Sequence, residues 1–240
     1  MEYKNLPDNH DSRLKYYEIL LERKNVENIP HFPLPEGYRF VFYQDGDKRD
    51  WIEIEKSAKE FHTFEEGEQA WERYYGGHES ELYDRMFFIE TLQGEKVATA
   101  TAYYDLPGEV HSPEEICNKT CNTENTECSD GDDSGDTSEE GWLHWVAVKR
   151  TYQGRGLARP LISRTLHRLA ELGYSSIKIP TQTTTWVAAK IYLDFGFTPV
   201  PDHAVRSREG YRILKTLTNH PALEEFETVP FEEIWNENSN

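Results

Sequence analysis

Two glycines one residue apart, at the mouth of a helix surrounded by arginines, are the clearest chemical feature of this sequence. They are Gly154 and Gly156, in the stretch VKRTYQGRGLARPLISRTLHRL of residues 148–169. The first four amides of a helix lack internal hydrogen-bond partners, and the aligned peptide dipoles attract an anion to that end. Glycines let the backbone approach a ligand closely because they carry no side chain. The pattern predicts that this turn holds a phosphate-bearing group.

The neighbours of the turn agree with an anion. In a helix that begins near Arg155 or Gly156, Pro160 lies about four residues in, where its missing N–H removes little or nothing from the helix hydrogen bonds. Positive side chains also gather here in an otherwise acidic protein: Lys149, Arg150, Arg155 and Arg159. Each of these could equally be an ordinary residue on a solvated helix face.

Two common nucleotide-binding motifs do not fit the turn. A dinucleotide fingerprint needs G-x-G-x-x-G, and Arg159 stands where its third glycine would be. A phosphate loop of the Walker type ends in Gly-Lys followed by Ser or Thr, which is absent from this stretch. Nucleotide binding of these two kinds is disfavoured.

The turn and a second segment together resemble the GNAT superfamily of N-acetyltransferases. QGRGLA, residues 153–158, matches the family signature Q/R-x-x-G-x-G/A and follows the strand-like run LHWVAV. AAKIYLDFGF, residues 188–197, is similar to the family's A-x-x-x-Y-x-x-x-G-F. The resemblance spans roughly residues 141–200. It implies an acetyl-CoA-dependent N-acetyltransferase with a mixed α/β fold (α+β), in which the central sheet splays.

The resemblance also implies which residues bind acetyl-CoA. The backbone of Val146 to Val148 would pair with the pantetheine arm where the sheet splays. Pro180 suits that place, since proline cannot donate to a strand ladder and is tolerated where strands part. The amides from Gln153 through Ala158 would hold the pyrophosphate. The implied cofactor residues are Val146, Ala147, Val148, Gln153, Gly154, Arg155, Gly156, Leu157, Ala158 and Thr185.

Acyl transfer from a thioester to an amine needs three further groups. The amine must lose a proton, the carbonyl oxygen must be stabilised as it gains charge, and the departing thiolate must be protonated. By resemblance, the amide of Val146 is the oxyanion donor and Tyr192 is the general acid. Tyr192 also belongs to an apolar helical stripe, so simple packing is the alternative. Thr185 stands where many family members have asparagine, and it could cap the last helix.

The general base has several candidates. His144 stands where the arylalkylamine acetyltransferases of this superfamily carry a histidine, and an imidazole suits proton removal near neutral pH. Strict strand alternation would put His144, Val146 and Val148 on one face, toward the carbonyl. The alternative is a packed histidine between two tryptophans. The alternative general bases, which would act through a water molecule, are Glu139, Glu140 and Glu53.

The charge of the chain limits its partners. The formal net charge is −18 over 240 residues, whereas nucleic acids and anionic membranes require a dominant positive field. We therefore expect a small cationic amine as acceptor, with no nucleic-acid or membrane partner, in a monomer or homodimer. No apolar run is long enough to span a bilayer and the first residues lack a signal-peptide core, so a cytoplasmic protein is expected. The three cysteines, Cys117, Cys121 and Cys128, predict no metal site.

The order of elements predicts a mixed α/β sheet. A helix is expected over residues 12–24, followed by a strand from Tyr38 and helices from Asp50 and Thr63. A hairpin around QGE, the strand GWLHWVAV, the glycine-opened helix, the strand SSIKIPTQ and a helix ending at Gly196 follow, with FTPV and GYRILKTL as closing strands. The early helices carry an aromatic set that could wall an acceptor site or form core: Phe61, Phe64, Trp71, Tyr74 and Tyr75.

Three parts of the chain are expected. Residues 1–36 would form an N-terminal helical extension, residues 37–218 the acetyltransferase domain, and residues 219–240 a peripheral acidic tail. Within the domain, the polar and acidic segment 107–140 is expected to be a mobile insertion, because it cannot bury enough apolar surface to order itself. The alternatives to an acetyltransferase are a non-catalytic acyl-CoA-binding regulatory module and a transferase of a longer acyl chain.

Overall fold

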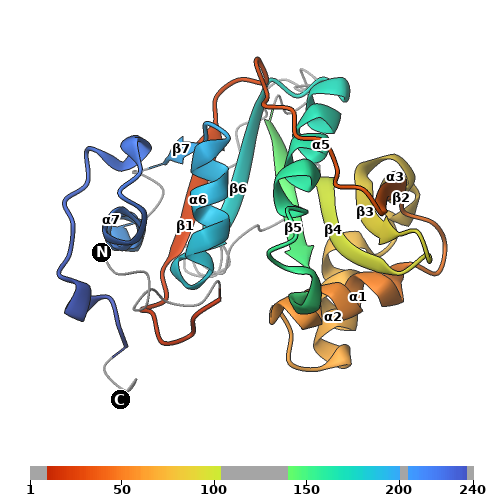
Figure 1. Ribbon diagram of the computed structural model, residues 1–240, viewed down its shortest axis with the longest axis horizontal. Helices are drawn as coiled ribbons and strands as arrows, with labels where there is room; N and C mark the ends of the chain where they lie inside the picture. Colours follow the sequence, from red (N-terminus) through yellow and green to blue (C-terminus); the bar gives the residue numbers. More distant parts are fainter. Residues whose placement is uncertain (1–9, 104–139, 201–204, 237–240) are drawn as a thin grey trace, which may run out of the picture.

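A seven-stranded sheet in the order β2-β3-β4-β5-β6-β1-β7 organises the protein (Figure 1). The computed structural model describes residues 10–103, 140–200 and 205–236, and the predicted acidic insertion and its cysteines lie outside them, apart from Glu140. The strands are β1 (Glu18–Arg23), β2 (Tyr38–Phe42), β3 (Met86–Thr91), β4 (Lys96–Tyr103), β5 (Glu140–Val148), β6 (Ser176–Gln182) and β7 (Thr198–Pro199). The predicted mixed α/β sheet is confirmed, since among the described strands only β5 and β6 pair in parallel.

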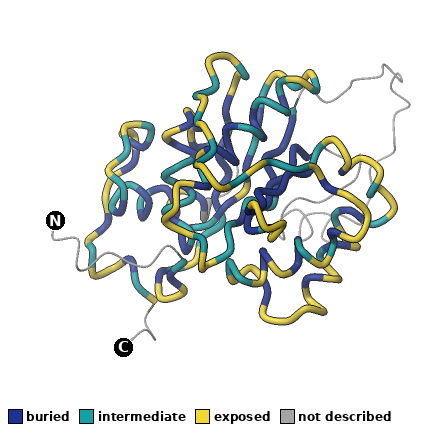
Figure 2. The backbone as a smooth tube through the Cα atoms, turned by 45° about the vertical axis from the view of Figure 1, so that its right-hand side comes forward, coloured by how far each residue is buried: buried dark blue, intermediate teal, exposed yellow. Residues whose placement is uncertain are grey.

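Helices cover both faces of the sheet. They are α1 (Lys48–Ala58), α2 (Phe64–Tyr75), α3 (Glu79–Arg85), α5 (Ala158–Glu171), α6 (Trp186–Asp194) and α7 (Val205–Thr218). Successive residues of the fully buried β3 point to opposite faces: Met86 and Phe88 pack with α1 and α2, whereas Phe87 and Ile89 pack with α5. In Figure 2 the buried residues run through the middle of the molecule and the exposed ones through outer turns.

The centre of the sheet opens between β5 and β6. These strands pair only over Glu140 to Trp142 against Ser176 to Lys178. Beyond this point β5 pairs with β4, and β6 pairs with β1. The expected splay is therefore present, and Pro180 lies on the parted section of β6.

The expected helix over residues 12–24 is wrong, because this segment contains strand β1. Ile19, Leu20 and Leu21 are all buried, as a strand inside a sheet requires on both of its faces. Such a continuous apolar run also satisfies helical spacing by chance. Residues 1–36 thus supply a strand between β6 and β7.

The closing strand expected in GYRILKTL is wrong as well, because this segment belongs to helix α7. The position next to β6 is already filled by β1, so the segment packs across β1 as a helix. The hydroxyl of Tyr211 donates a hydrogen bond to the carbonyl of Leu20 at 2.7 Å. FTPV is confirmed as a strand, the short β7.

The tail after Asn219 is part of the core rather than peripheral. Leu223, Phe226 and Ile234 are buried in the cluster that contains α6 and α7. The tail also bridges back to the start of the described chain, where Leu14 and Trp235 form an antiparallel bridge. Among the described helices, none is both long and apolar enough to cross a membrane.

Candidate active site

The glycine turn before α5 has the conformation and the free amides of an anion site. Gly154 and Gly156 have φ angles of +75° and +78°, which favour glycine. Within the described residues, the amides of Gly154 to Leu157 have no hydrogen-bond partner. The first helical bond runs from Leu161 N to Leu157 O at 3.2 Å, so Pro160 removes none, as predicted.

The turn faces a cavity of about 530 Å³, which we call the turn cavity. A Cβ atom built on Gly154 meets no heavy atom within 4 Å, and one on Gly156 meets only Pro35 Cγ at 3.8 Å. The walls combine backbone and apolar side chains from β5, the turn and α6. They include Val146, Ala147, Val148, Gln153, Gly154, Gly156, Leu157, Ala158, Thr185, Val187, Ala188, Ile191 and Tyr192.

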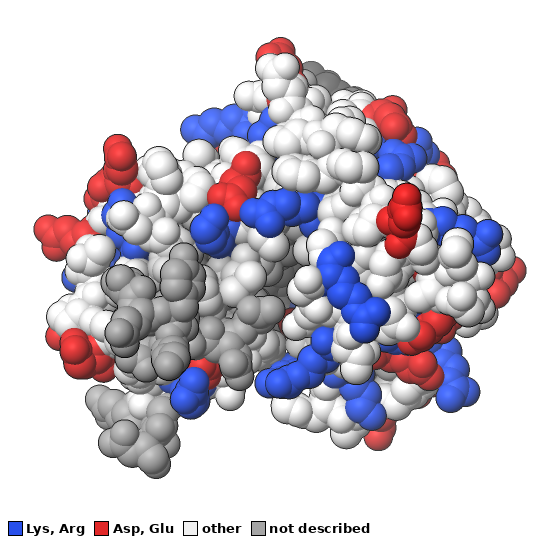
Figure 3. Space-filling model, in the orientation of Figure 1, with Lys and Arg blue, Asp and Glu red and all other residues white. Residues whose placement is uncertain are grey.

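The basic side chains around the turn engage neighbours on the protein. Lys149 Nζ lies 3.2 Å from a Glu95 oxygen, and Arg159 Nη2 lies 2.7 Å from Asp194. Arg155 is absent from the cavity wall; its guanidinium lies over the Tyr152 ring, 4.5 Å from the centroid. Lys and Arg side chains gather around a hollow on the face in Figure 3. These side chains add a positive field, and of the four basic residues predicted to surround the turn only Arg159 lines the turn cavity, beside the free backbone amides.

Strand β5 carries a bulge at the mouth of the splay. His144 is in register with Thr101 and Ala147 with Thr99, so Trp145 and Val146 together oppose a single residue of β4. Trp145 has a φ of +47°, in the left-handed region. Within the described strands Val146 has no register partner on β4 or β6, and it lines two cavities.

The bulge overturns the expected alternation of β5. Because two residues of β5 oppose one residue of β4, the side chains after the bulge point to the opposite face from the one that strict alternation predicts. His144 and Ala147 therefore pack with α1 and α2, whereas Val148 packs with α5. His144, Val146 and Val148 therefore do not share one face.

A second cavity of about 320 Å³ lies on the other side of the bulge. Three carboxyl groups line it, those of Glu18, Glu55 and Glu60, and we call it the acidic cavity. Its described lining contains no Lys or Arg. Its aromatic wall is formed by Tyr16, Tyr74, Trp145 and Tyr192.

The two cavities share part of their walls. The shared residues are Glu60, Val146, Thr185, Ala188 and Tyr192. Groups held in the two cavities can therefore meet at these side chains.

Only one member of the early aromatic set lines a cavity. Tyr74 faces the acidic cavity, whereas Phe61, Trp71 and Tyr75 belong to the core beside α1 and α2. Phe64 is exposed. The acceptor wall thus takes fewer residues from these helices than the sequence suggests.

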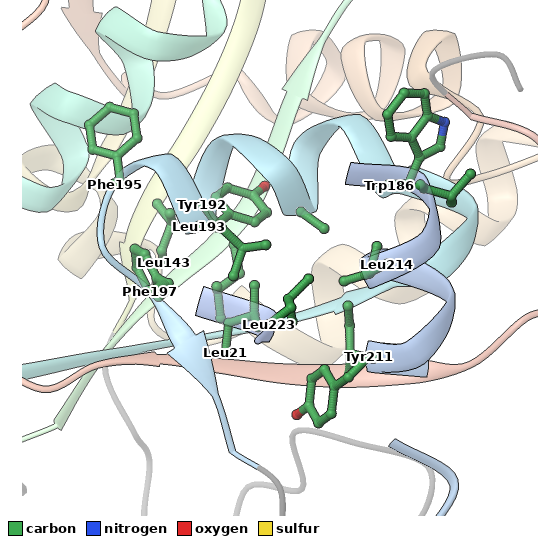
Figure 4. Packing of buried hydrophobic residues seen from close by; sticks show 14 of the residues in the cluster. Leu21, Leu143, Trp186, Tyr192, Leu193, Phe195, Phe197, Tyr211, Leu214 and Leu223 are labelled. Atoms are coloured by element: carbon green, nitrogen blue, oxygen red, sulfur yellow. The ribbon is translucent and has the colours of Figure 1, made fainter. Parts of the chain in front are cut away.

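Tyr192 serves both the core and the junction of the cavities. Its side chain packs among Leu143, Leu193 and Phe197 in the cluster of Figure 4 and is 4% exposed. Burial raises the pKa of Tyr192 well above its ordinary value, and the charges of Glu60 and Glu55 raise it further. The phenol therefore keeps its proton at neutral pH and can donate it.

His144 is held in a ring of tyrosines. Its imidazole stacks on Tyr103 with the centroids 4.3 Å apart, and the Tyr74 ring meets it edge-on at 5.0 Å. The side chain is 7% exposed and lines the acidic cavity. Packing between aromatic rings and access to the cavity are thus combined in one residue.

The other predicted bases lie elsewhere. Glu53 is exposed on α1, 3.0 Å from Arg49, and Glu140 pairs with Lys178 at 2.6 Å; neither lines either cavity. Glu139 lies outside the described residues. Sequence reasoning missed Glu55 and Glu60. One signal was present, because Glu55 interrupts the apolar stripe of α1 four residues after Trp51.

Thr185 lines both cavities, but it does not cap α6 as expected. Its hydroxyl donates to the carbonyl of Gln182 at 3.1 Å and lies 3.2 Å from the Thr181 hydroxyl. The residue closes the short 3-10 turn Thr183–Thr185 ahead of the helix.

Comparison with known proteins agrees with this geometry. The model of the acetyltransferase (GNAT) family matches residues 49–197 of the chain. No curated protein matches the sequence significantly.

Solved structures are similar to the chain at low sequence identity, and one of them aligns with a TM-score above 0.5. A GCN5-related N-acetyltransferase from Sphaerobacter thermophilus aligns with a TM-score of 0.52 and 16% identity, over 78% of this chain and 49% of that one. A GNAT-family acetyltransferase from Colwellia psychrerythraea aligns with a TM-score of 0.48 and 14% identity, over 78% of this chain and 54% of that one. The alignment thus spans about half the length of these proteins.

Proposed function

The chain belongs to the GNAT acetyltransferase family, and from this premise we propose that it transfers the acetyl group of acetyl-CoA to a primary amine by direct attack in a ternary complex. The observation that carries the proposal is the meeting of two cavities at Val146 and Tyr192. One cavity contains a phosphate-type turn, and the other contains acidic and aromatic groups suited to an amine.

The residues of the turn cavity fit two parts of acetyl-CoA, the pyrophosphate and the pantetheine arm. The free amides of Gly154 to Leu157 would bind the pyrophosphate at the start of α5. The parted section of β5, Val146 to Val148, would bind the pantetheine arm along its backbone. Acetyl-CoA supplies an activated thioester, and the protein orients it toward the acidic cavity.

Two groups at the junction would assist transfer. The amide of Val146 stands on the bulge and would stabilise negative charge on the carbonyl oxygen. Tyr192 would protonate the departing thiolate, since its raised pKa keeps the phenol protonated. Both residues line each cavity, as a group acting on the acetyl carbon must.

The proton of the amine needs an acceptor in the acidic cavity. His144 lines this cavity and remains the base proposed from the sequence. The carboxyl groups that face the same space are the competing candidates. We propose that the transferase domain comprises residues 37–218 together with β1 from the preceding segment and the tail that packs against α6 and α7.

Acetyl-CoA binding and thiol release test the proposal together. Calorimetric titration should show acetyl-CoA binding, and primary amines should release free CoA thiol. Binding without turnover of any amine would favour the non-catalytic module. Faster turnover of a longer acyl thioester would favour the alternative acyl donor. The acetyltransferase proposal fails if the folded protein does not bind acetyl-CoA.

A further inference from the structure

The acidic cavity contains an uncompensated buried carboxyl group. Glu55 is 1% exposed, and within the described residues its Oε1 has no hydrogen-bond partner. Burial raises the pKa of Glu55 well above its ordinary value, and the charge of Glu60 raises it further. A buried carboxyl group without a partner is costly unless a ligand satisfies it. The side chain lines the cavity, so a ligand there could do so.

Glu60 stands between the two cavities. It is solvent-accessible inside a concave wall, where surrounding protein raises the pKa of its carboxyl group by desolvation. The turn that follows α1 presents it there: Lys59 has a φ of +75°, and Glu60 N donates to the carbonyl of Glu55 at 3.1 Å. The two carboxyl groups thus come from one helix end, with Glu60 at the junction.

The surroundings of Glu60 favour a cation. Burial raises the pKa of Tyr16 and of Tyr192, and the charge of Glu60 raises both further. The Tyr16 hydroxyl donates to Glu18 Oε1 at 3.3 Å, so this acid belongs to the same wall. His144 and Tyr74 close the cavity from β5 and α2. The cationic side chain next to Glu60 in the sequence is Lys59, at the end of α1.

We propose that Glu55 and Glu60 form an ammonium site for the acceptor and that Glu60 is the general base of the transfer. The proposal rests on the acetyltransferase function proposed above. It predicts a primary alkylammonium acceptor without a carboxylate, because three acids on the wall repel a negative group and aromatic faces attract a positive one.

The step balances as follows. Glu60 accepts one proton from the ammonium nitrogen and later releases it to solvent. The nitrogen lone pair forms the N–C bond as the thioester C–S bond breaks. The nitrogen releases its second proton to solvent. The sulfur gains a proton from Tyr192, which regains one from solvent. The products are an amide, CoA thiol and one released proton.

Isosteric substitutions test the ammonium site. We compare the parent, Glu60→Gln, Glu55→Gln and the control Glu53→Gln, an exposed residue of the same helix outside both cavities. At neutral pH, Glu60→Gln should lower kcat/KM for 1,4-diaminobutane about 100-fold, with acetyl-CoA affinity unchanged. The deficit should shrink toward about pH 10, where the amine loses its proton unaided. A purely structural role for Glu60 would not produce that pH dependence.

Binding gives a readout that needs no turnover. Calorimetric titration of the CoA-loaded protein with 1,4-diaminobutane should show affinity about tenfold weaker in Glu55→Gln and in Glu60→Gln than in Glu53→Gln. In thiol release by the parent, 4-aminobutanoate should be at least about tenfold poorer than butan-1-amine and 1,4-diaminobutane.

Each contrary result has its own meaning. Glu60→Gln as active as Glu53→Gln overturns the base, and equal use of 4-aminobutanoate overturns the acceptor class. Equal 1,4-diaminobutane affinity in all four proteins overturns the ammonium site. A parent that binds acetyl-CoA but acetylates none of the three amines also overturns the acceptor class. If the folded parent does not bind acetyl-CoA, the proposed acetyltransferase function is overturned, and the proposal of the ammonium site, which rests on it, is overturned as well.

Discussion

The turn cavity presents backbone amides and mainly apolar side chains, whereas the acidic cavity presents three carboxyl groups and the aromatic side chains of Tyr16, Tyr74, Trp145 and Tyr192. The amides of the turn cavity come from one short stretch beside α5, with φ angles that two glycines adopt easily. The acidic cavity draws side chains from β1, α1, α2, β5 and β6. A phosphate group can thus be recognised by local backbone geometry, while an amine site of this kind depends on long-range packing.

The junction of the two cavities depends on a few irregular features. Without the bulge at Trp145, strand alternation would carry on through Val148, and the Val146 amide would be committed to a ladder. Without the parted section of β6, the space around Tyr192 would be closed by sheet pairing. Chemistry at the junction therefore depends on where the sheet is interrupted.

The largest expected effect is a loss of acetyl-CoA affinity from a substitution that changes the turn cavity alone. Gly156→Glu puts a negative side chain at a φ of +78° in front of the free amides. We expect acetyl-CoA affinity to fall about 1,000-fold, because the carboxylate repels the pyrophosphate and competes for the amides. Calorimetric titration measures the loss.

A matched control isolates the strain and charge of that substitution. Gly94→Glu adds the same side chain at a φ of +86°, with nothing within 4 Å of the new Cβ, in the turn between β3 and β4. A new Cβ at Gly156 meets only Pro35 Cγ, at the ordinary contact distance of 3.8 Å, so the two sites are comparably open. The Gly94→Glu variant should bind acetyl-CoA as the parent does. Equal binding by both variants would show that the turn does not hold phosphate.

The next effect concerns the junction. Tyr192→Phe keeps the packed ring and removes the proton donor, so kcat should fall about 100-fold while acetyl-CoA binding stays within about twofold. Because burial raises the pKa of Tyr192, the parent should show no loss of kcat from this group at mildly alkaline pH. The protonated phenol of Tyr192 is the active form, and its raised pKa keeps it protonated to higher pH.

A tyrosine of the core provides the contrast. Tyr211→Phe loses the hydrogen bond to Leu20 and should cost about 1 kcal/mol of unfolding free energy, with kcat retained. Urea unfolding and thiol release measure the two quantities. If Tyr192→Phe behaves like Tyr211→Phe, Tyr192 is a packing residue only.

A smaller effect distinguishes the two candidate bases within the acidic cavity. His144→Phe preserves a ring stacked on Tyr103 but removes the imidazole nitrogens. With Glu60 as base, kcat/KM should fall by about tenfold or less, through altered packing of the wall. A loss of about 100-fold, together with loss of the acidic limb of the pH profile, would make His144 the base instead.

The two cavities also differ in how far the sequence predicts them. The glycine turn, Pro160 and Tyr192 could be placed in the chain from local patterns, because the turn and the helices beside it are local structures. The mixed α/β sheet followed from the order of elements, and its splay was implied by the resemblance to the GNAT superfamily. These features need only short-range information.

Long-range competition decided the features that the sequence did not predict. The apolar runs around Leu21 and Tyr211 are each compatible with a strand or a helix. Because only one of them can pair with β6, the first forms strand β1 and the second forms helix α7, which packs against the sheet. The bulge on β5 likewise moved Val148 away from the face of His144. Sequence reasoning missed Glu55 because its burial depends on strands far away in the sequence.

The smallest expected effect tests the turn that presents Glu60. Lys59 is the C-terminal cap of α1, at a φ that costs a non-glycine residue about 1 kcal/mol. Lys59→Gly relieves this strain, but glycine's greater freedom in the unfolded chain offsets part of the gain. We expect a net stabilisation of about 0.5 kcal/mol in urea unfolding.

Lys59→Ala is the control for that gain, because it removes the charged side chain and keeps the Cβ atom that causes the strain. It should leave the unfolding free energy nearly unchanged. Turnover should survive in both variants, since the backbone bond from Glu60 N to Glu55 O remains. If Lys59→Gly destabilises the protein, or if either variant loses turnover, the lysine side chain itself contributes to the acidic cavity, and the backbone turn alone does not position Glu60.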